Sequence, residues 1–205
     1  MLELTLRQKQ LKAAEDKAYF TSAIDFGFMK MLSKPDWSKE LAIVNSVKEV
    51  FGLERAINCQ RCVVAHEARM RGYDVIARPS WGFSDPMLKA ENWLASFDYS
   101  FSEFKKCNGQ TVEEVIESIT KIMRSFGDGS RAIIRFEWEN RKSGSGHVIV
   151  SACFENGIVN LGDPQEKSRA AAKHLKSAKL DSIILLRIDN LRFTDVVKRC
   201  CMNRE

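Results

Sequence analysis

Residues 144–165, GSGHVIVSACFENGIVNLGDPQ, decide the fold of this chain. The runs 147–154 and 158–161 are rich in apolar and β-branched residues, which is typical of strands. The ENG between them is a hairpin-turn signal, because Asn and Gly tolerate the positive φ of such turns. The sequence therefore predicts two antiparallel strands that bring His147 and Asp163, 16 residues apart, side by side.

Helical patterns precede this hairpin, and further strands surround it. Apolar spacing, with Gly or Pro at the ends, predicts helices over 2–33, 37–50, 59–71 and 111–126. Additional elements are expected as strands over 73–77, 132–139 and 182–188 and as helices over 170–179 and 194–200. Helices followed by an antiparallel sheet form an α+β arrangement, with the N-terminal helices packed on the sheet.

Pro35 breaks the first helical pattern and suggests a domain boundary. We expect residues 1–35 to form an N-terminal accessory helix and residues 36–205 to form the domain that carries the chemistry. Within that domain, residues 80–110 are irregular and rich in aromatics. They predict a long loop with short helical turns that packs on the core or serves as a lid or substrate-binding surface.

The composition argues against several classes of protein. The content of 44% hydrophobic and 29% charged residues is that of a soluble globular protein, and the net charge of +5 comes from interspersed charges. Without a basic stripe or a run of about 18 apolar residues, we expect neither nucleic acid nor a membrane as partner. The first 20 residues, MLELTLRQKQLKAAEDKAYF, lack the apolar region of a classical signal peptide. The six cysteines are therefore expected to be reduced thiols.

One of these thiols, Cys59, has the setting that a nucleophile needs. It lies where a turn enters the predicted helix 59–71, so unpaired backbone N–H groups point towards its sulfur and favour the thiolate. His147 follows a glycine-rich turn and is the candidate base, while Asp163 is the candidate group that orients its ring. Asn58, beside the cysteine, is a candidate donor to the oxyanion.

Other interpretations of the same residues stay open. Cys62, one helical turn further on, is the alternative nucleophile. Cys59, Cys62 and His66 can also be viewed as metal ligands, but a single short helix without a partner C-x-x-C is a poor zinc pattern. We therefore expect no metal and no cofactor. Taken alone, His147 can be a structural histidine and Asp163 a turn former.

Two segments carry a family resemblance: residues 58–79, NCQRCVVAHEARMRGYDVIARP, and the hairpin segment quoted first. With the spacing between them, they resemble the papain-fold toxin family, the Tox-PL-type glutamine deamidase-like cysteine enzymes. The resemblance covers about residues 56–166 and implies a papain-like fold. It also implies a triad made of the cysteine after Asn, the histidine after Gly and the aspartate of D-x-Q. These are Cys59, His147 and Asp163 here, with Gln165 completing the motif.

The resemblance further implies a thiol-dependent amidohydrolase, a protein-glutamine deamidase acting as a toxin or effector domain. The same triad also serves a cysteine peptidase or a transglutaminase. A non-enzymatic binding module on a papain-like scaffold is the alternative from another class.

Members of this family occur as domains of polymorphic toxins, secreted effectors and prophage fusions. The expected partners are therefore a protein substrate in a target cell and an immunity protein. We expect the chain to act in the cytoplasm, with delivery into another cell or association with a phage as open routes.

Overall fold

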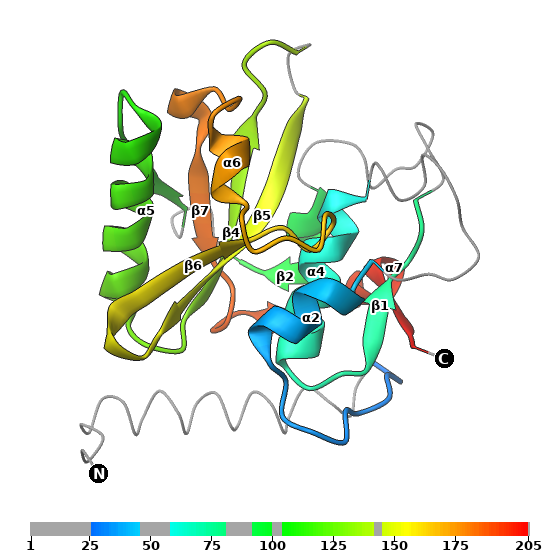
Figure 1. Cartoon of the computed structure of the whole chain (residues 1–205). Helices are drawn as coiled ribbons and strands as arrows, with labels where there is room; N and C mark the ends of the chain where they lie inside the picture. The colour runs from blue at the N-terminus through cyan, green and yellow to red at the C-terminus, as the bar shows by residue number, and fades with distance from the viewer. Residues whose placement is uncertain (1–25, 46–57, 81–91, 100–103, 142–144, 205) are drawn as a thin grey trace.

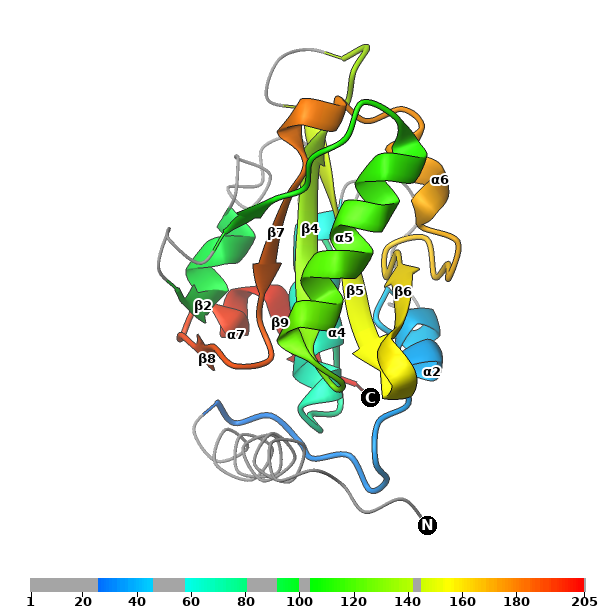
Figure 2. The same cartoon turned by 90° about the vertical axis from the view of Figure 1, so that its left-hand side faces the viewer.

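The computed structural model describes residues 26–45, 58–80, 92–99, 104–141 and 145–204. Its centre is a five-stranded antiparallel sheet in the order β3, β7, β4, β5, β6 (Figures 1 and 2). These strands are β3 (Lys105–Lys106), β4 (Arg131–Glu137), β5 (Gly146–Phe154), β6 (Ile158–Gly162) and β7 (Ile184–Arg187). Helices combined with this sheet confirm the predicted α+β class.

The predicted hairpin is present and forms one side of the sheet. β5 and β6 pair in antiparallel register, with Val150 opposite Gly162. Asn156 and Gly157 in the turn between them have φ angles of 63° and 69°. Positive φ at two successive residues is what an Asn-Gly hairpin signal predicts. The other edge of β5 pairs with β4 along the whole length of β4.

Helices cover both faces of this sheet, as Figure 1 shows. One face carries α5 (Val112–Phe126) and the short α6 (Ala172–Leu175). The other face carries α2 (Trp37–Ile43), α4 (Cys59–Met70) and α7 (Val197–Cys200). Successive residues of a strand point to opposite sides, so Ile133 joins the core beneath α4 and Ile134 joins the core beneath α5.

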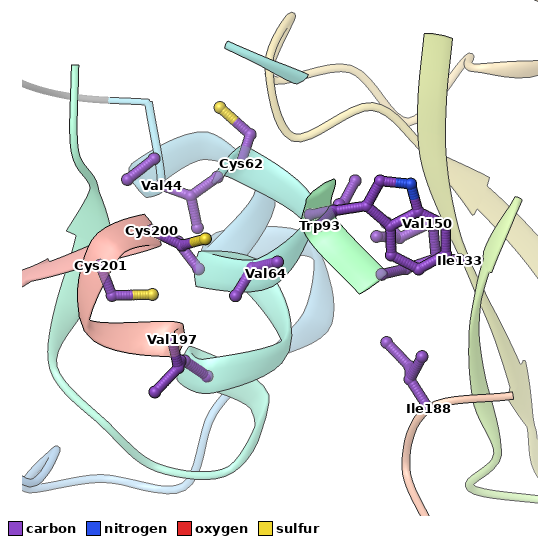
Figure 3. Packing of buried hydrophobic residues seen from close by; sticks show 14 of the residues in the cluster. Val44, Cys62, Val64, Trp93, Ile133, Val150, Ile188, Val197, Cys200 and Cys201 are labelled. Atoms are coloured by element: carbon purple, nitrogen blue, oxygen red, sulfur yellow. The ribbon is translucent and has the colours of Figure 1, made fainter. Parts of the chain in front are cut away.

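The helix α4 runs through the interior of the molecule. Its side chains from Arg61 to Arg69 are all buried. Figure 3 shows Val64 of this helix beside Val197 and Cys200 of α7, within the same core as Ile133 of the sheet. A helix enclosed in this way has little freedom to move, and this rigidity holds Cys59 at its first residue in place.

Charged side chains on α4 are buried in pairs. Glu67 is bonded to Arg71 on the same helix at 2.7 Å and to Arg131 of β4 at 2.8 Å. Burial raises the pKa of Glu67, but the two guanidinium groups outweigh burial and hold the pKa at about 2. Arg71 also donates to the carbonyls of Ile188 and Leu191. These bonds join α4 to β4 and to the chain that follows β7.

The helices predicted over 59–71 and 111–126 and the strands β4 to β7 of the main sheet lie close to their predicted positions. The helix predicted over 37–50 ends at Ile43, and several short elements also differ. The structure reduces the predicted helix 170–179 to four residues, and the described part of the predicted long loop over 80–110 contains a 3₁₀ helix and two short strands. Short strands pair outside the main sheet in two ribbons, β1 with β9 and β2 with β8. The remaining elements are β1 (Val75–Ala77), η3 (Asn92–Ser96), β2 (Phe97–Asp98), η5 (Glu155–Gly157), η6 (Leu180–Ser182), β8 (Arg192–Phe193) and β9 (Cys201–Asn203).

The predicted accessory helix falls mostly outside the described residues, which begin at Phe26. The described part of that segment, residues 26–35, is not helical and packs on the domain. Phe26 lies against the core beneath α4, and Met29 donates its N–H to Asn203 at 2.9 Å. The proposed boundary at residue 35 stays a prediction. Within the described ranges, no helix has the length and apolar character needed to cross a membrane.

The buried carboxylate of Glu67 generates a stability prediction. Glu67→Gln removes the charge that compensates Arg71 and Arg131, and we expect a loss of about 3–5 kcal/mol in the free energy of unfolding. Urea denaturation followed by circular dichroism measures this loss. Asp195→Asn is the control, because it removes the exposed ion pair with Lys198 and should leave stability unchanged. Equal midpoints for both variants would contradict the structural role of Glu67.

Candidate active site

Two glycines place the predicted base and its orienting carboxylate. A Cβ on Gly146 would lie 2.4 Å from the carbonyl oxygen of Phe136, so only glycine allows β4 to approach the residue before His147. A Cβ on Gly162 would lie 2.6 Å from the ring of Trp37 on α2. The close packing of α2 against the end of β6 thus sets the position of the next residue, Asp163.

The structure brings the three residues of the predicted triad together. The ring nitrogen Nε2 of His147 lies 2.8 Å from Oδ2 of Asp163. Cys59 lies close enough to His147 for its side chain to raise the pKa of the imidazole. With Nε2 occupied by Asp163, the other ring nitrogen is the one left for the thiol. Asp163 is fully buried, whereas Cys59 is only partly buried, so the sulfur is the accessible end of the chain of contacts.

The charges of this group favour an imidazolium at His147 beside the carboxylate of Asp163. Burial lowers the pKa of His147, but hydrogen bonds to Asp163 and Cys59 outweigh burial and raise the pKa to about 10. Burial raises the pKa of Asp163, but the hydrogen bond to His147 outweighs it and leaves the pKa below its usual value. An imidazolium beside a thiol at the start of a helix stabilises the thiolate, the form that attacks a carbonyl carbon.

The loop after β6 holds Asp163 from its other side. Oδ1 of Asp163 accepts the backbone N–H of Gln165 at 2.8 Å and of Glu166 at 3.2 Å. Asp163 and Ser168 also exchange two backbone hydrogen bonds, which close the loop. The carboxylate is thus held by a short ring of backbone bonds and has little freedom to rotate away from His147.

Gln165 connects this loop to the start of α4. Its side-chain Oε1 accepts the backbone N–H of Asn58 at 3.1 Å, and its carbonyl accepts from the side chain of Asn45 at 2.9 Å. The D-x-Q motif therefore reaches both His147 and the residue before Cys59. Asn58 is 2% exposed, and its side-chain Nδ2 donates to the carbonyl of Arg78. Its amide is thus engaged with the end of β1, and its oxyanion role stays a prediction.

The geometry favours Cys59 over Cys62 as nucleophile. Cys62 is completely buried, and burial together with the neighbouring Cys59 raises its pKa well above the usual value. His66 is equally buried, and burial lowers its pKa to about 4. Its Nε2 faces the carbonyl of Trp37 at 3.4 Å. His66 is thus a neutral structural histidine inside α4.

Two residues of this site were missed in the sequence. Trp138 stacks on the ring of His147, with centroids 5.6 Å apart and planes at 21°. His174 of α6 places its Nε2 3.0 Å from Oδ2 of Asp163. The chain has three histidines, so the position of His174 eleven residues after Asp163 was a usable signal. No comparable signal marked Trp138, because it is one of four tryptophans and only the fold brings it to His147.

One group of side chains has the types that can hold a metal ion. Among the described residues, ligand atoms within 4.8 Å of one another are offered by His147, Asp163 and His174. Tetrahedral zinc separates its nitrogen and oxygen ligands by about 3.3 Å, whereas Nε2 of His147 and Oδ2 of Asp163 lie 2.8 Å apart. The spacing is that of a hydrogen bond. Cys59, Cys62 and His66, considered as ligands from the sequence, are not part of this group.

Comparison with known proteins identifies one family. The family model described as papain fold toxin 1, glutamine deamidase matches residues 57–168, which are more than half of the 205 residues. The matched segment includes Cys59, His147, Asp163 and Gln165 and ends before His174. This match bears out the papain-like fold. No curated protein and no solved structure matches the chain.

The burial of the thiols predicts selective alkylation. Five of the six cysteines are buried and Cys59 is partly exposed, so iodoacetamide at near-neutral pH should modify Cys59 alone in the folded protein. Peptide mass spectrometry locates the modified residue. His147→Ala should slow this reaction by at least about tenfold, because the thiolate loses its imidazolium. Preferential modification of Cys62 would contradict the assignment of the nucleophile.

The three histidines should titrate at three different pH values. We expect His66 to titrate near pH 4 and His147 near pH 10, with His174 below its ordinary value, so that His147 is the ring charged at pH 7. Nuclear magnetic resonance of the imidazole protons measures each curve. Asp163→Asn should lower the pKa of His147, because the hydrogen bond to a carboxylate is lost. An unchanged His147 curve in that variant would contradict the coupling.

Proposed function

Because the chain belongs to the papain fold toxin 1 family of glutamine deamidases, we propose that it deamidates a glutamine side chain of a protein in a target cell. The observation that carries this proposal is the contact of His147 with both Cys59 and Asp163. A partly exposed thiol, a buried base and a buried carboxylate are the groups that acyl transfer through a thioester requires. Because the family is described as glutamine deamidases, we propose a carboxamide as the substrate group.

The first half of the proposed reaction forms a thioester. The thiolate of Cys59 attacks the carboxamide carbon, and the electron pair of the carbonyl moves to its oxygen. Backbone N–H groups at the start of α4 stabilise this oxyanion, since the first N–H groups of a helix have no partner within it. The intermediate then collapses, the carbon–nitrogen bond breaks, and His147 gives its proton to the departing ammonia.

The second half returns the enzyme to its starting state. The neutral imidazole of His147 takes a proton from water, and the resulting hydroxide attacks the thioester carbon. The carbon–sulfur bond breaks, Cys59 leaves as thiolate, and a glutamate side chain is released. Asp163 stays charged throughout and stabilises the imidazolium in both halves. The net change on the substrate is one neutral amide converted to one carboxylate.

The alternative functions differ in the nucleophile that attacks the thioester and in the kind of amide bond that the site accepts. A peptidase accepts a backbone amide, and a transglutaminase lets an amine attack in place of water. A binding module has no thioester at all. The products separate these functions: deamidation changes one residue, proteolysis gives fragments, and transamidation links two chains.

Expression in a heterologous cell tests the proposal. We expect the wild type to be toxic and to convert specific glutamines of a host protein to glutamate, as measured by mass spectrometry of the proteome. Cys59→Ala should abolish both effects, and His147→Ala should lower the rate by about 10²–10⁴-fold.

Cys62→Ala is the matched control, because Cys62 is the buried thiol one turn away, and this variant should keep the activity. Toxicity that survives Cys59→Ala but not Cys62→Ala would move the nucleophile. Toxicity that survives both substitutions would remove the enzymatic proposal. Fragments or crosslinks in place of glutamate would favour the peptidase or the transglutaminase.

A further inference from the structure

His174 is a second imidazole on the carboxylate that orients the proposed base. Its Nε2 lies 3.0 Å from Oδ2 of Asp163, the oxygen that also faces His147 at 2.8 Å. The rings of His147 and His174 are 5.2 Å apart between centroids, at an angle of 65°. His174 comes from α6, outside the segment that matches the family, so the family match assigns it no role.

The four contacts of Asp163 show what His174 adds. Backbone N–H groups of Gln165 and Glu166 hold Oδ1, but Oδ2 is held by the two histidines alone among the described contacts. Three of these four contacts are hydrogen bonds, and the contact of His174 is the remaining one on Oδ2. Without His174, only His147 would oppose rotation of the carboxylate about its Cβ–Cγ bond on the Oδ2 side. His147 is the base that this carboxylate is proposed to orient.

The contact of His174 is electrostatic rather than a well-aligned hydrogen bond. Its Nε2 is buried and has no hydrogen-bond partner of good geometry, although Oδ2 of Asp163 is 3.0 Å away and Oε2 of Glu166 is 3.4 Å away. A buried N–H without a partner is unfavourable unless a nearby charge stabilises it. The negative charge of Asp163 stabilises the N–H of His174, and the same attraction holds Oδ2 of Asp163 near His174.

The surroundings of His174 keep its ring neutral at pH 7. Burial lowers the pKa of His174; Glu166 and Asp163 raise it, while His147 and Lys173 lower it, and the net result is below the ordinary value. A neutral N–H stabilises the carboxylate without adding a second cation beside the imidazolium. Trp138 lies edge-on to His174 and stacks on His147, so it limits the access of water to both rings.

We propose that His174 is a positioning residue, which holds Oδ2 of Asp163 towards His147 and so maintains the pair of His147 with Cys59. This inference rests on the proposed function, because it assigns a role within the same site. Among the described contacts none joins His174 to the thiol, so we assign its effect to the contact with Asp163.

Alkylation of Cys59 tests this role without knowledge of the substrate. The second-order rate constant with iodoacetamide is measured from pH 5 to 10 for the wild type, His174→Met and His174→Gln. Met fills the space without a donor, and we expect a rate about tenfold lower at pH 7, because a less well-held His147 stabilises the thiolate less. Gln keeps an N–H donor and should restore most of the rate. Lys176→Gln, an exposed change just after α6, is the surface control and should match the wild type.

A second measurement separates positioning from packing. The imidazole titration of His147 should shift to lower pH in His174→Met and return towards the wild-type value in His174→Gln. A merely structural role predicts altered thermal melting without these shifts. If His174→Met does not fold, His174→Ala replaces it, because α6 ends one residue later and tolerates a smaller side chain at lower cost.

The outcomes are distinguishable from those of the proposed function. If His147→Ala slows alkylation while folded His174→Met reacts like the wild type, the positioning role is wrong and the proposed function stands. A His174→Gln variant as slow as His174→Met would also overturn the role, since the donor would then not matter. If His147→Ala itself reacts like the wild type, the catalytic pair fails and the proposed function with it.

Discussion

The packing of α4 against the central sheet is the constraint on which the rest of the structure depends. Its apolar residues share one core with β4 and β5, and Glu67 on its buried face is bonded to Arg131 of β4. Both contacts lie along the length of the helix, while Cys59 stands at its first residue. The thiol can be partly exposed because the remainder of α4 is anchored in the interior.

A buried charge network at the end of the sheet complements this anchoring. His147 holds a positive charge between Cys59 and Asp163, and every oxygen of Asp163 is in contact with a donor. A histidine with a raised pKa stabilises the folded state fully below its unfolded pKa of about 6.5. That contribution is lost as the pH rises towards about 10. The ion pair of the proposed catalytic site therefore also contributes to the stability of the fold in neutral solution.

How much of this structure the sequence predicts depends on how far apart along the chain the interacting residues lie. The hairpin from β5 to β6 was predictable because Asn156 and Gly157 form a local turn signal between two apolar runs. Since this hairpin brings His147 and Asp163 together, most of the proposed triad was predictable with it. The ribbon of β1 with β9 was not, because strands of three residues carry no periodicity and pair only through the tertiary fold. His174 could have been noted as one of only three histidines, but its contact with Asp163 arises from the tertiary fold and leaves no local pattern.

The separation of the site residues along the chain has a kinetic consequence. Cys59 and His147 are 88 positions apart, and their contact requires both the pairing of β5 within the sheet and the packing of α4 against it. Folds dominated by such distant contacts form slowly, because the entropy of closing long loops is lost before the contacts are gained. Until that stage, Cys59 is an ordinary thiol among six. In a newly made or unfolded chain, Cys59 should therefore react like the other thiols. An increase in its reactivity would then report the last step of folding.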